Sequence, residues 1–95
     1  MHRKRHITVT EIFFKDGYEE VHKWLDATYR PWIGFSHWIK RHHVEAITAK
    51  YGEDSVEYKV AFLHIMSDFL SHLGLFIVPK SKEECREILN ELMLI

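Results

Sequence analysis

The sequence predicts a mainly α-helical protein, a compact bundle of about four helices with a short extended N-terminal arm or strand. Apolar residues recur at helical spacing over most of the chain, and glycines and prolines fall mainly between those segments. Hydrophobic residues make up 46% of the 95 residues, which is enough to build a buried core. A chain of this length folds around one core, so residues 1–95 are expected to form a single domain.

The residue pattern predicts the elements in chain order. Residues 7–14 begin with the alternating run Ile-Thr-Val-Thr, which favours the short strand or extended arm. Asp16 and Gly17 predict a turn, and apolar residues at helical spacing then predict a helix over residues 18–29. A proline separates this helix from a second one, which is expected over residues 32–51.

Glycine, aspartate and serine mark the ends of the remaining elements. Gly52 suits the C-cap of the second helix. Asp54 offers an N-cap for a third helix, and Gly74 stands where that helix should end. Ser81 and Glu84 have the spacing of a capping box, which predicts a last helix that runs through residue 92.

Charge and cysteine content narrow the classes of function. Thirteen Lys and Arg against fourteen Asp and Glu give a net charge of −1, which argues against nucleic-acid binding through bulk charge. Residues 1–6 are expected to form a mobile basic tail; the alternative is an arm that grips phosphates. Cys85 is the only cysteine, so neither an internal disulfide nor a thiolate zinc cluster can form within the chain. No run approaches the ~18 apolar residues of a membrane span. We therefore expect a cytoplasmic protein with no membrane partner.

Histidine and aspartate recur at helical spacing beside the apolar faces. His22 and Asp26 lie one turn apart on the first predicted helix. His64 and Asp68 lie one turn apart on the third, with His72 one turn further along. Side chains at this spacing can converge on one ligand.

The second predicted helix adds two adjacent histidines. His42 and His43 lie about 100° apart and bracket its apolar face, so at least one should point inward, whereas His37 and Arg41 turn toward the polar side. Three helices thus supply imidazole and two add carboxylate, which are the donors that transition-metal sites use. The sequence predicts a divalent metal ion between the helices, with Zn²⁺ the first choice and Fe, Mn or Ni as alternatives.

An alternative interpretation treats each histidine separately. A histidine beside an apolar face can be an ordinary hydrogen-bonded residue, and a His-Asp pair can be a surface contact on a helix. The cluster would then be a structural hydrogen-bond network in a non-catalytic interaction module or a homo-oligomer such as a homodimer. Repetition of the pattern across three helices favours the metal.

Helical spacing favours core packing over a ligand cage for the aromatic residues Trp24, Trp32, Phe35 and Trp38.

Three sequence segments resemble a known pattern. They are Val-His-Lys-Trp-Leu-Asp at 21–26, Phe-Ser-His at 35–37 with Arg-His-His-Val-Glu at 41–45, and the pair His64 and Asp68. They match I/V-H-x-W-F/L-D, F-x-H-x-x-x-R-H-H-x-E and H-x-x-x-D, and in this the chain resembles a family of small proteins classed as domain of unknown function 6915. The family has no activity attached to it, so the resemblance implies a shared site and no reaction. It picks out His22, Asp26, His37, Arg41, His42, His43, Glu45, His64 and Asp68.

Spacing and resemblance together give a candidate ligand set: His22, Asp26, His43, His64 and Asp68, with His42 and His37 as substitutes. Arg41 and Glu45 are expected to support these ligands or to contact anions. His2 and His6 are expected to lie outside the site, because both fall in the basic tail. If one coordination position stays open, the ion could activate water for hydrolysis of a phosphate or an amide, with Asp68 or Glu45 as the base.

Overall fold

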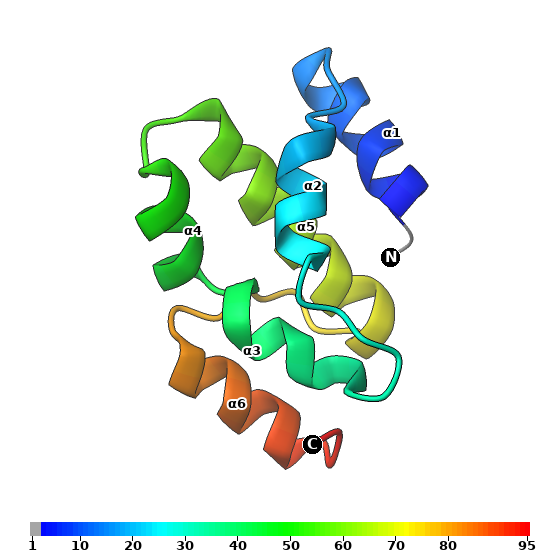
Figure 1. The fold of residues 1–95 in the computed structure, drawn as a ribbon, viewed down its shortest axis with the longest axis vertical. Helices are drawn as coiled ribbons and strands as arrows, with labels where there is room; N and C mark the ends of the chain where they lie inside the picture. The colour runs from blue at the N-terminus through cyan, green and yellow to red at the C-terminus, as the bar shows by residue number, and fades with distance from the viewer. Residues whose placement is uncertain (1–2) are drawn as a thin grey trace.

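The predicted mainly helical fold class is confirmed. The computed structural model describes residues 3–95, and within them it has six α-helices and one 3₁₀ helix instead of about four helices, with no strand (Figure 1). The elements are α1 (Arg3–Phe14), α2 (Glu19–Asp26), η1 (Gly34–His37), α3 (Trp38–Arg41), α4 (Val44–Tyr51), α5 (Val56–Leu73) and α6 (Lys82–Glu91).

The predicted N-terminal arm or strand is wrong, because this segment forms α1. The hydroxyls of Thr8 and Thr10 donate to the carbonyls of Lys4 and His6, at 2.9 and 2.6 Å, so the polar groups of these β-branched residues are satisfied inside the helix. Helix α1 packs on α2 and α5, and tertiary contact overrides its weak local preference. Residues 3–6 of the predicted mobile tail belong to this helix, and residues 1 and 2 lie outside the described residues.

The predicted turn between the first two helices is a point of close contact. The backbone N–H of Tyr18 donates to Oδ1 of Asp16 at 2.8 Å, which orders the turn. A Cβ atom placed on Gly17 would lie only 2.7 Å from Cγ2 of Ile7. A residue with a side chain at position 17 would therefore require the side chain of Ile7, or α1 itself, to shift.

The single helix predicted over residues 32–51 is wrong, because the chain leaves helical geometry in two places. Gly34 has φ +52°, a left-handed conformation that favours glycine, and the short helices η1 and α3 follow it. His42 (φ −92°, ψ 54°) and His43 (φ −155°, ψ 159°) then separate α3 from α4. His43 becomes the N-cap of α4, and its Nδ1 accepts a hydrogen bond from the backbone N–H of Ala46 at 3.2 Å.

A distant segment completes the start of α4. The backbone N–H groups of Val44 and Glu45 donate to the carbonyls of Pro79 and Lys80, at 2.8 and 3.0 Å. These N–H groups have no partner inside their own helix, so the contact satisfies them. Because residues 79–80 lead into α6, the same contact helps to hold α6 beside α3.

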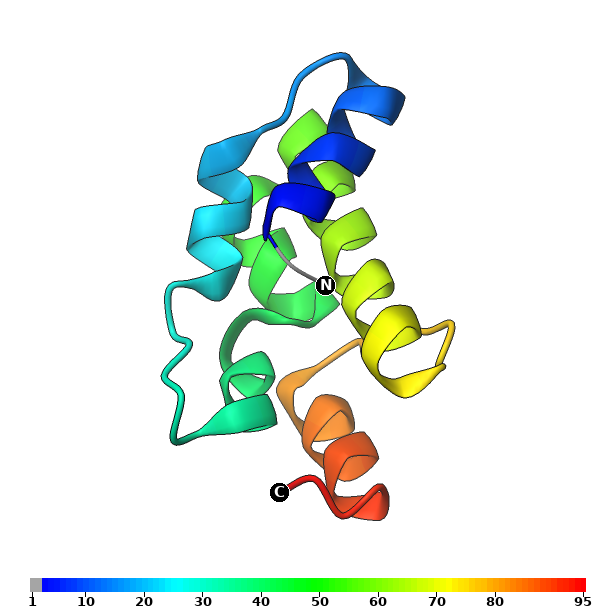
Figure 2. The ribbon, with the colours of Figure 1, turned by 90° about the vertical axis from the view of Figure 1, so that its right-hand side faces the viewer.

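Helix α5 runs through the middle of the molecule and carries much of the core. Ser55 caps its N-terminus instead of the predicted Asp54, Gly74 ends it with φ +68°, and Ser81 caps α6 as predicted. Figures 1 and 2 place α1 and α6 toward opposite ends of the long axis. The buried apolar residues are Val21, Leu25, Trp38, Ile39, Ile47, Val60, Ala61, Ile65, Phe69, Cys85 and Leu89.

None of the helices within residues 3–95 has the length and apolar composition needed to cross a membrane.

Candidate metal centre

Buried imidazoles, the buried carboxylate of Asp68 and the partly exposed carboxylate of Asp26 gather where α1, α2 and α5 meet the junction between α3 and α4. We call this group the His/Asp cluster: His6, His22, Asp26, His42, His64 and Asp68. Its four imidazoles are at most 2% exposed. Buried polar groups of this kind require partners, so the contacts of each ring atom can be followed in turn.

Asp68 connects three segments of the chain. Its Oδ1 lies 3.0 Å from Nε2 of His6, and its Oδ2 lies 3.0 Å from Nε2 of His42. Because an ionised carboxylate can only accept, both imidazoles donate from Nε2–H. Burial alone would raise the pKa of Asp68, but hydrogen bonds from His42 and His6 and the nearby imidazole of His64 hold it well below the usual range. Asp68 is therefore an anion inside the protein.

A chain of hydrogen bonds fixes the protons of His22 and His64. The hydroxyl of Thr10 donates its one proton to the carbonyl of His6, so its oxygen accepts from Nε2–H of His22 at 3.0 Å. Burial, followed by the nearby charge of His64, lowers the pKa of His22 to about 4, which keeps this ring neutral at pH 7. Nδ1 of His22 is then bare, and it accepts a hydrogen bond from Nδ1–H of His64 at 2.7 Å. A neutral His64 must therefore have a bare Nε2.

Nε2 of His64 faces two carboxylates. It lies 3.1 Å from Oδ2 of Asp68 and 3.5 Å from Oδ1 of Asp26, yet it makes no hydrogen bond of acceptable geometry within residues 3–95. A lone pair and two carboxylate oxygens repel one another, so the position requires positive charge. Burial lowers the pKa of His64, but Asp26 and Asp68 raise it more, to above its ordinary value. Either a second proton on His64 or a cation between the three groups meets this requirement.

Four donor atoms surround the position at the spacing of a metal site. The ligand atoms of Asp26, His42, His64 and Asp68 all lie within 4.8 Å of one another. The four separations between imidazole nitrogens and carboxylate oxygens are 3.0, 3.1, 3.5 and 3.9 Å. A regular tetrahedron with bonds of about 2.1 Å has edges of about 3.4 Å. The two imidazole planes are 70° apart, which allows their in-plane lone pairs to converge.

A second group of three imidazoles fits a metal less well. His6, His22 and His64 also place ligand atoms within 4.8 Å of one another. The rings of His6 and His64 are stacked with centroids 3.6 Å apart and planes only 12° apart, so their lone pairs do not converge. The 2.7 Å between Nδ1 of His22 and Nδ1 of His64 is a hydrogen-bond distance. These contacts orient His64 and are poorly suited to sharing an ion.

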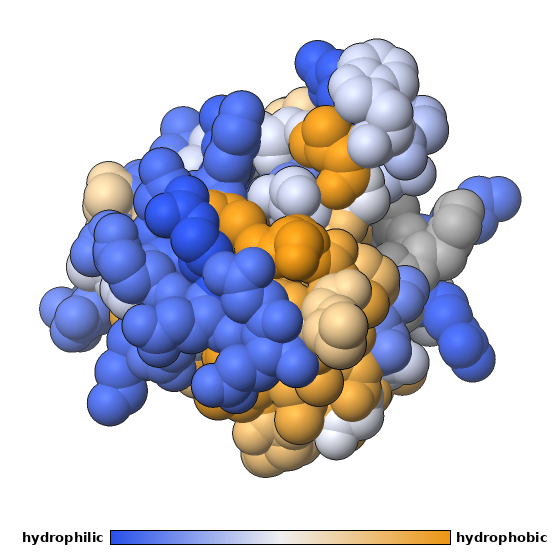
Figure 3. All heavy atoms as spheres, turned by 90° about the horizontal axis from the view of Figure 1, so that it is seen from below, coloured by the Kyte–Doolittle hydropathy of each residue, from blue (hydrophilic) through white to orange (hydrophobic). Residues whose placement is uncertain are grey.

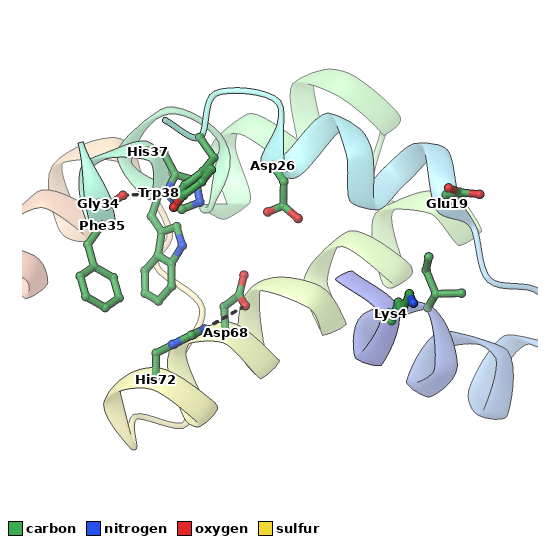
Figure 4. Close-up of a pocket in the computed structure, with 11 residues that line it drawn as sticks. Lys4, Glu19, Asp26, Gly34, Phe35, His37, Trp38, Asp68 and His72 are labelled. Atoms are coloured by element: carbon green, nitrogen blue, oxygen red, sulfur yellow. Dashed lines mark hydrogen bonds and ion pairs between the residues drawn. The ribbon is translucent and has the colours of Figure 1, made fainter. Parts of the chain in front are cut away.

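A cavity of about 920 Å³ opens beside the four donors. Figure 4 shows Asp26 on α2 and Asp68 on α5 projecting toward one another from opposite walls. Lys4 lies toward one end of the view, and Phe35 and Trp38 lie toward the other. The volume is in the range of small-molecule sites, so a ligand could reach the carboxylates without unfolding the chain.

The predicted ligands divide into two groups. Asp26, His64 and Asp68 supply donors to the four-atom group, together with the substitute His42. His22 contacts His64 from behind this group and orients it. The two pairs predicted from one-turn spacing therefore do meet in one place.

The other predicted residues lie outside the four-atom group. His43 accepts from Ala46 N–H at Nδ1 and donates to the carbonyl of Ile39 at 3.0 Å, so both ring nitrogens are engaged with backbone. Arg41 donates to the carbonyl of Trp24 at 2.7 Å and lies over its ring, which ties α3 to the end of α2. Neither side chain has a nitrogen directed at the carboxylates.

His37 and Glu45 also lie apart from the donors. Nδ1 of His37 donates to the carbonyl of Gly34 at 2.8 Å, and its ring packs edge-on against that of His42. His37 lines the cavity, whereas Glu45 is exposed in the first turn of α4. The carboxylate of Glu45 interacts electrostatically with His43, which itself lies outside the four-atom group.

Sequence reasoning missed His6 and Thr10. The prediction that His6 lies outside the cluster is wrong, because its ring donates to Asp68 and stacks on His64. His6 and Thr10 have the same one-turn spacing as His22 and Asp26. This spacing could therefore have indicated that His6 and Thr10 share one face, but only if residues 3–14 had been predicted as a helix.

Replacement of Thr10 by valine tests the hydrogen-bond chain. Thr10→Val keeps the shape of the side chain but leaves Nε2–H of His22 without its hydroxyl acceptor, so we expect a loss of about 1–3 kcal/mol in the free energy of unfolding. Thr8→Val is a matched control, since Thr8 makes the same kind of bond to its own helix but is exposed. Urea unfolding measures both. Equal effects of the two substitutions would contradict the proton assignment.

Comparison of the chain with protein-family models, with curated proteins and with solved structures finds no match. The resemblance to the family described above stays a prediction.

Proposed function

We propose that this chain binds one divalent transition-metal ion through Asp26, His42, His64 and Asp68. The observation that carries the proposal is the buried Nε2 of His64, which faces two carboxylates without a hydrogen bond. Two imidazole nitrogens and two carboxylate oxygens suit Zn²⁺ first, with Fe, Mn or Ni as alternatives.

The rest of the cluster would hold the ligands in place. His22 and Thr10 fix the ring of His64, and His6 donates to the carboxylate oxygen of Asp68 that is turned away from the four donors. Supporting contacts of this kind orient metal ligands and strengthen binding. His42 must move its proton from Nε2 to Nδ1 when it binds the ion, because Nε2–H donates to Asp68 in the structure.

The cavity beside Asp26 and Asp68 supports a catalytic extension of the proposal. A bound divalent ion supplies Lewis acidity and lowers the pKa of water that reaches it, which is the chemistry of metal-dependent hydrolysis. Both carboxylates line the cavity, so substrate would approach from that side. Exposed Glu45, which is absent from this lining, is not retained as a base.

Zinc titration of the untagged chain tests the proposal. We expect one equivalent of Zn²⁺ per chain, measured by competition with a chromogenic chelator. Asp26→Asn and His64→Ala are each expected to weaken binding by more than about 100-fold, because a lost ligand costs more than a lost supporting contact. Circular dichroism checks that each variant remains helical.

His43→Asn is the matched control for these variants. Asparagine also caps helices, so this change removes a buried imidazole while preserving the start of α4. Zinc affinity is expected to stay within about threefold of the parent chain, since no ligand is lost. The proposal fails if Asp26→Asn and His64→Ala retain full affinity, or if the untagged parent takes up no metal.

A non-catalytic interaction module is the second candidate. In that case His64 carries a second proton, and the His/Asp cluster is a hydrogen-bond network. Apolar side chains gather beside hydrophilic ones on the face seen in Figure 3, at the end of the molecule where α6 lies. The C-terminal residues Met93 and Ile95 are 89% and 41% exposed. A homodimer that buries this face predicts a mass that rises with concentration, without metal uptake.

A further inference from the structure

One end of the cavity is built from aromatic rings. Tyr29, Phe35 and Trp38 line it together with the imidazoles of His37 and His72. The ring of Phe35 meets Trp38 edge to face with centroids 4.9 Å apart, and Tyr29 meets His37 in the same way at 5.2 Å. Figure 4 shows Phe35, Trp38 and His72 grouped on one side of Asp68. Such a wall favours a flat apolar group.

The neighbouring part of the cavity offers a bound metal ion as the contact for an anionic group. Asp26 and Asp68 balance the two charges of the ion, and Lys4 and Glu19, which also line the cavity, balance one another, so the attraction for an anionic donor comes from coordination to the ion. Zn²⁺ held tetrahedrally by four protein donors can expand to a fifth coordination position, which an anionic group from outside the protein would fill. The buried rings of His42 and His64 occupy the protein side, so this position faces the cavity.

We infer that the cavity binds a small molecule made of an anionic, metal-coordinating group on a flat aromatic body. The anionic group contacts the ion at Asp26 and Asp68, and the aromatic body lies among Tyr29, Phe35 and Trp38. This inference rests on the proposed metal site and adds the class of ligand. The volume of about 920 Å³ accommodates a molecule of this kind.

Two phosphonates that differ only in their organic group test the inference. Isothermal titration calorimetry is performed with phenylphosphonate and methylphosphonate on Zn²⁺-loaded protein, and again after removal of zinc with a chelator. We expect phenylphosphonate to bind the loaded protein at least about tenfold more tightly than methylphosphonate, because only the phenyl ring reaches the aromatic wall. We also expect chelation to weaken phenylphosphonate binding at least about tenfold, because the anion loses its contact with zinc.

Substitutions in the aromatic wall show where the ring lies. Tyr29→Ala changes a half-exposed side chain, and Phe35→Leu retains apolar volume, so folding should survive both changes. Each should reduce the preference for phenylphosphonate at least about threefold. Phe76→Leu is the matched control, because Phe76 is 76% exposed and is not part of the cavity lining, and it should leave the preference unchanged.

Zinc content, measured before each titration, shows whether a negative result contradicts the metal site or only the proposed class of ligand. A chain that takes up no zinc overturns both the metal site and this inference. Zinc-loaded protein that binds neither phosphonate, or binds both equally, overturns the inference alone. The same holds if zinc-free protein binds phenylphosphonate as tightly as loaded protein does, or if both wall variants keep the full preference.

Discussion

Addition of Zn²⁺ to the metal-free chain is expected to raise its melting temperature by about 15 °C or more. The proposed ligands come from α2, from the junction of α3 and α4, and from α5, so an ion joins segments that separate on unfolding. An ion that binds only the folded state adds about 4 kcal/mol when its concentration is 1,000 times its dissociation constant. In a domain of about 100 residues, each kcal/mol shifts the melting temperature by about 4–8 °C.

Differential scanning calorimetry with and without a chelator measures this shift. Asp26→Asn should lose most of it, because a carboxylate donor is removed, whereas His43→Asn should keep it. Ions without affinity for imidazole and carboxylate, such as K⁺, should have no comparable effect. A chain that demonstrably contains zinc but melts at the same temperature after chelation would show that the ion does not join the helices.

Acidification of the metal-free chain from pH 7 to pH 4.5 is expected to lower its free energy of unfolding by several kcal/mol. Burial lowers the pKa of His42 to about 4, and burial together with the charge of His64 does the same for His22. The unfolded chain binds these protons near pH 6.5, so the stability is fully present above that value and is lost as the pH falls toward 4. Each group contributes up to about 3 kcal/mol.

The pKa shift of His64 changes the free energy of unfolding with pH in the opposite direction. Its pKa is raised, so its contribution is present below pH 6.5 and is lost as the pH rises through its folded-state pKa. The pKa values of His6, His22, His42, His43 and His72 are lowered and only that of His64 is raised, which leaves a net loss of stability in acid. Stability is small for a domain of this size, so the loss represents a large part of the total.

Urea unfolding at a series of pH values measures the dependence on acid. His42→Gln should reduce the slope between pH 6.5 and pH 4.5 by up to about 1.4 kcal/mol per pH unit, because one titrating group is removed. His72→Gln is the control, since the His72 side chain is 46% exposed and is expected to change the slope much less. A free energy of unfolding that stays constant down to pH 4.5 would contradict the assignment of His22 and His42 as buried neutral rings.

The sequence predicts helices well where the buried face is apolar. Helices α2 and α5 follow from apolar residues at helical spacing, and their bounds lie close to the predicted ranges. Apolar periodicity does not reveal helix α1, because the side chains that it is described to bury, His6 and Thr10, are polar. The run of Ile, Thr and Val in residues 7–10 favours a strand locally, and only contacts with α2 and α5 explain the helix.

The break at His42 and His43 shows a different limit. Both residues are compatible with a continuous helix, and no glycine or proline marks the break. The extended backbone at His43 allows its ring to cap α4, while the ring of His42 reaches Asp68. Long-range contacts decide this geometry, so local sequence could not indicate which of the two histidines joins the cluster.

The candidate site is likewise predictable from sequence where its residues share one helix, and not where they come from different helices. Pairs on one helix, such as His64 and Asp68, are recognisable because helical spacing brings them together. The contact between His6 and Asp68 spans 62 positions in the sequence and depends on how α1 packs. Spacing along the chain therefore identifies single-helix pairs, and only the fold identifies the complete set of donors.

The polar attachment of α1 has a consequence for local motion. The buried side chains of His6 and Thr10 are held by hydrogen bonds to Asp68 and His22. Protection of its amides from hydrogen exchange should therefore follow the protonation of those groups, and α1 should open as a unit before the core around α5 does. Lys4 and Ile7 of this helix form part of the cavity wall. Each such opening would widen the entrance to the carboxylates while the apolar core stays folded.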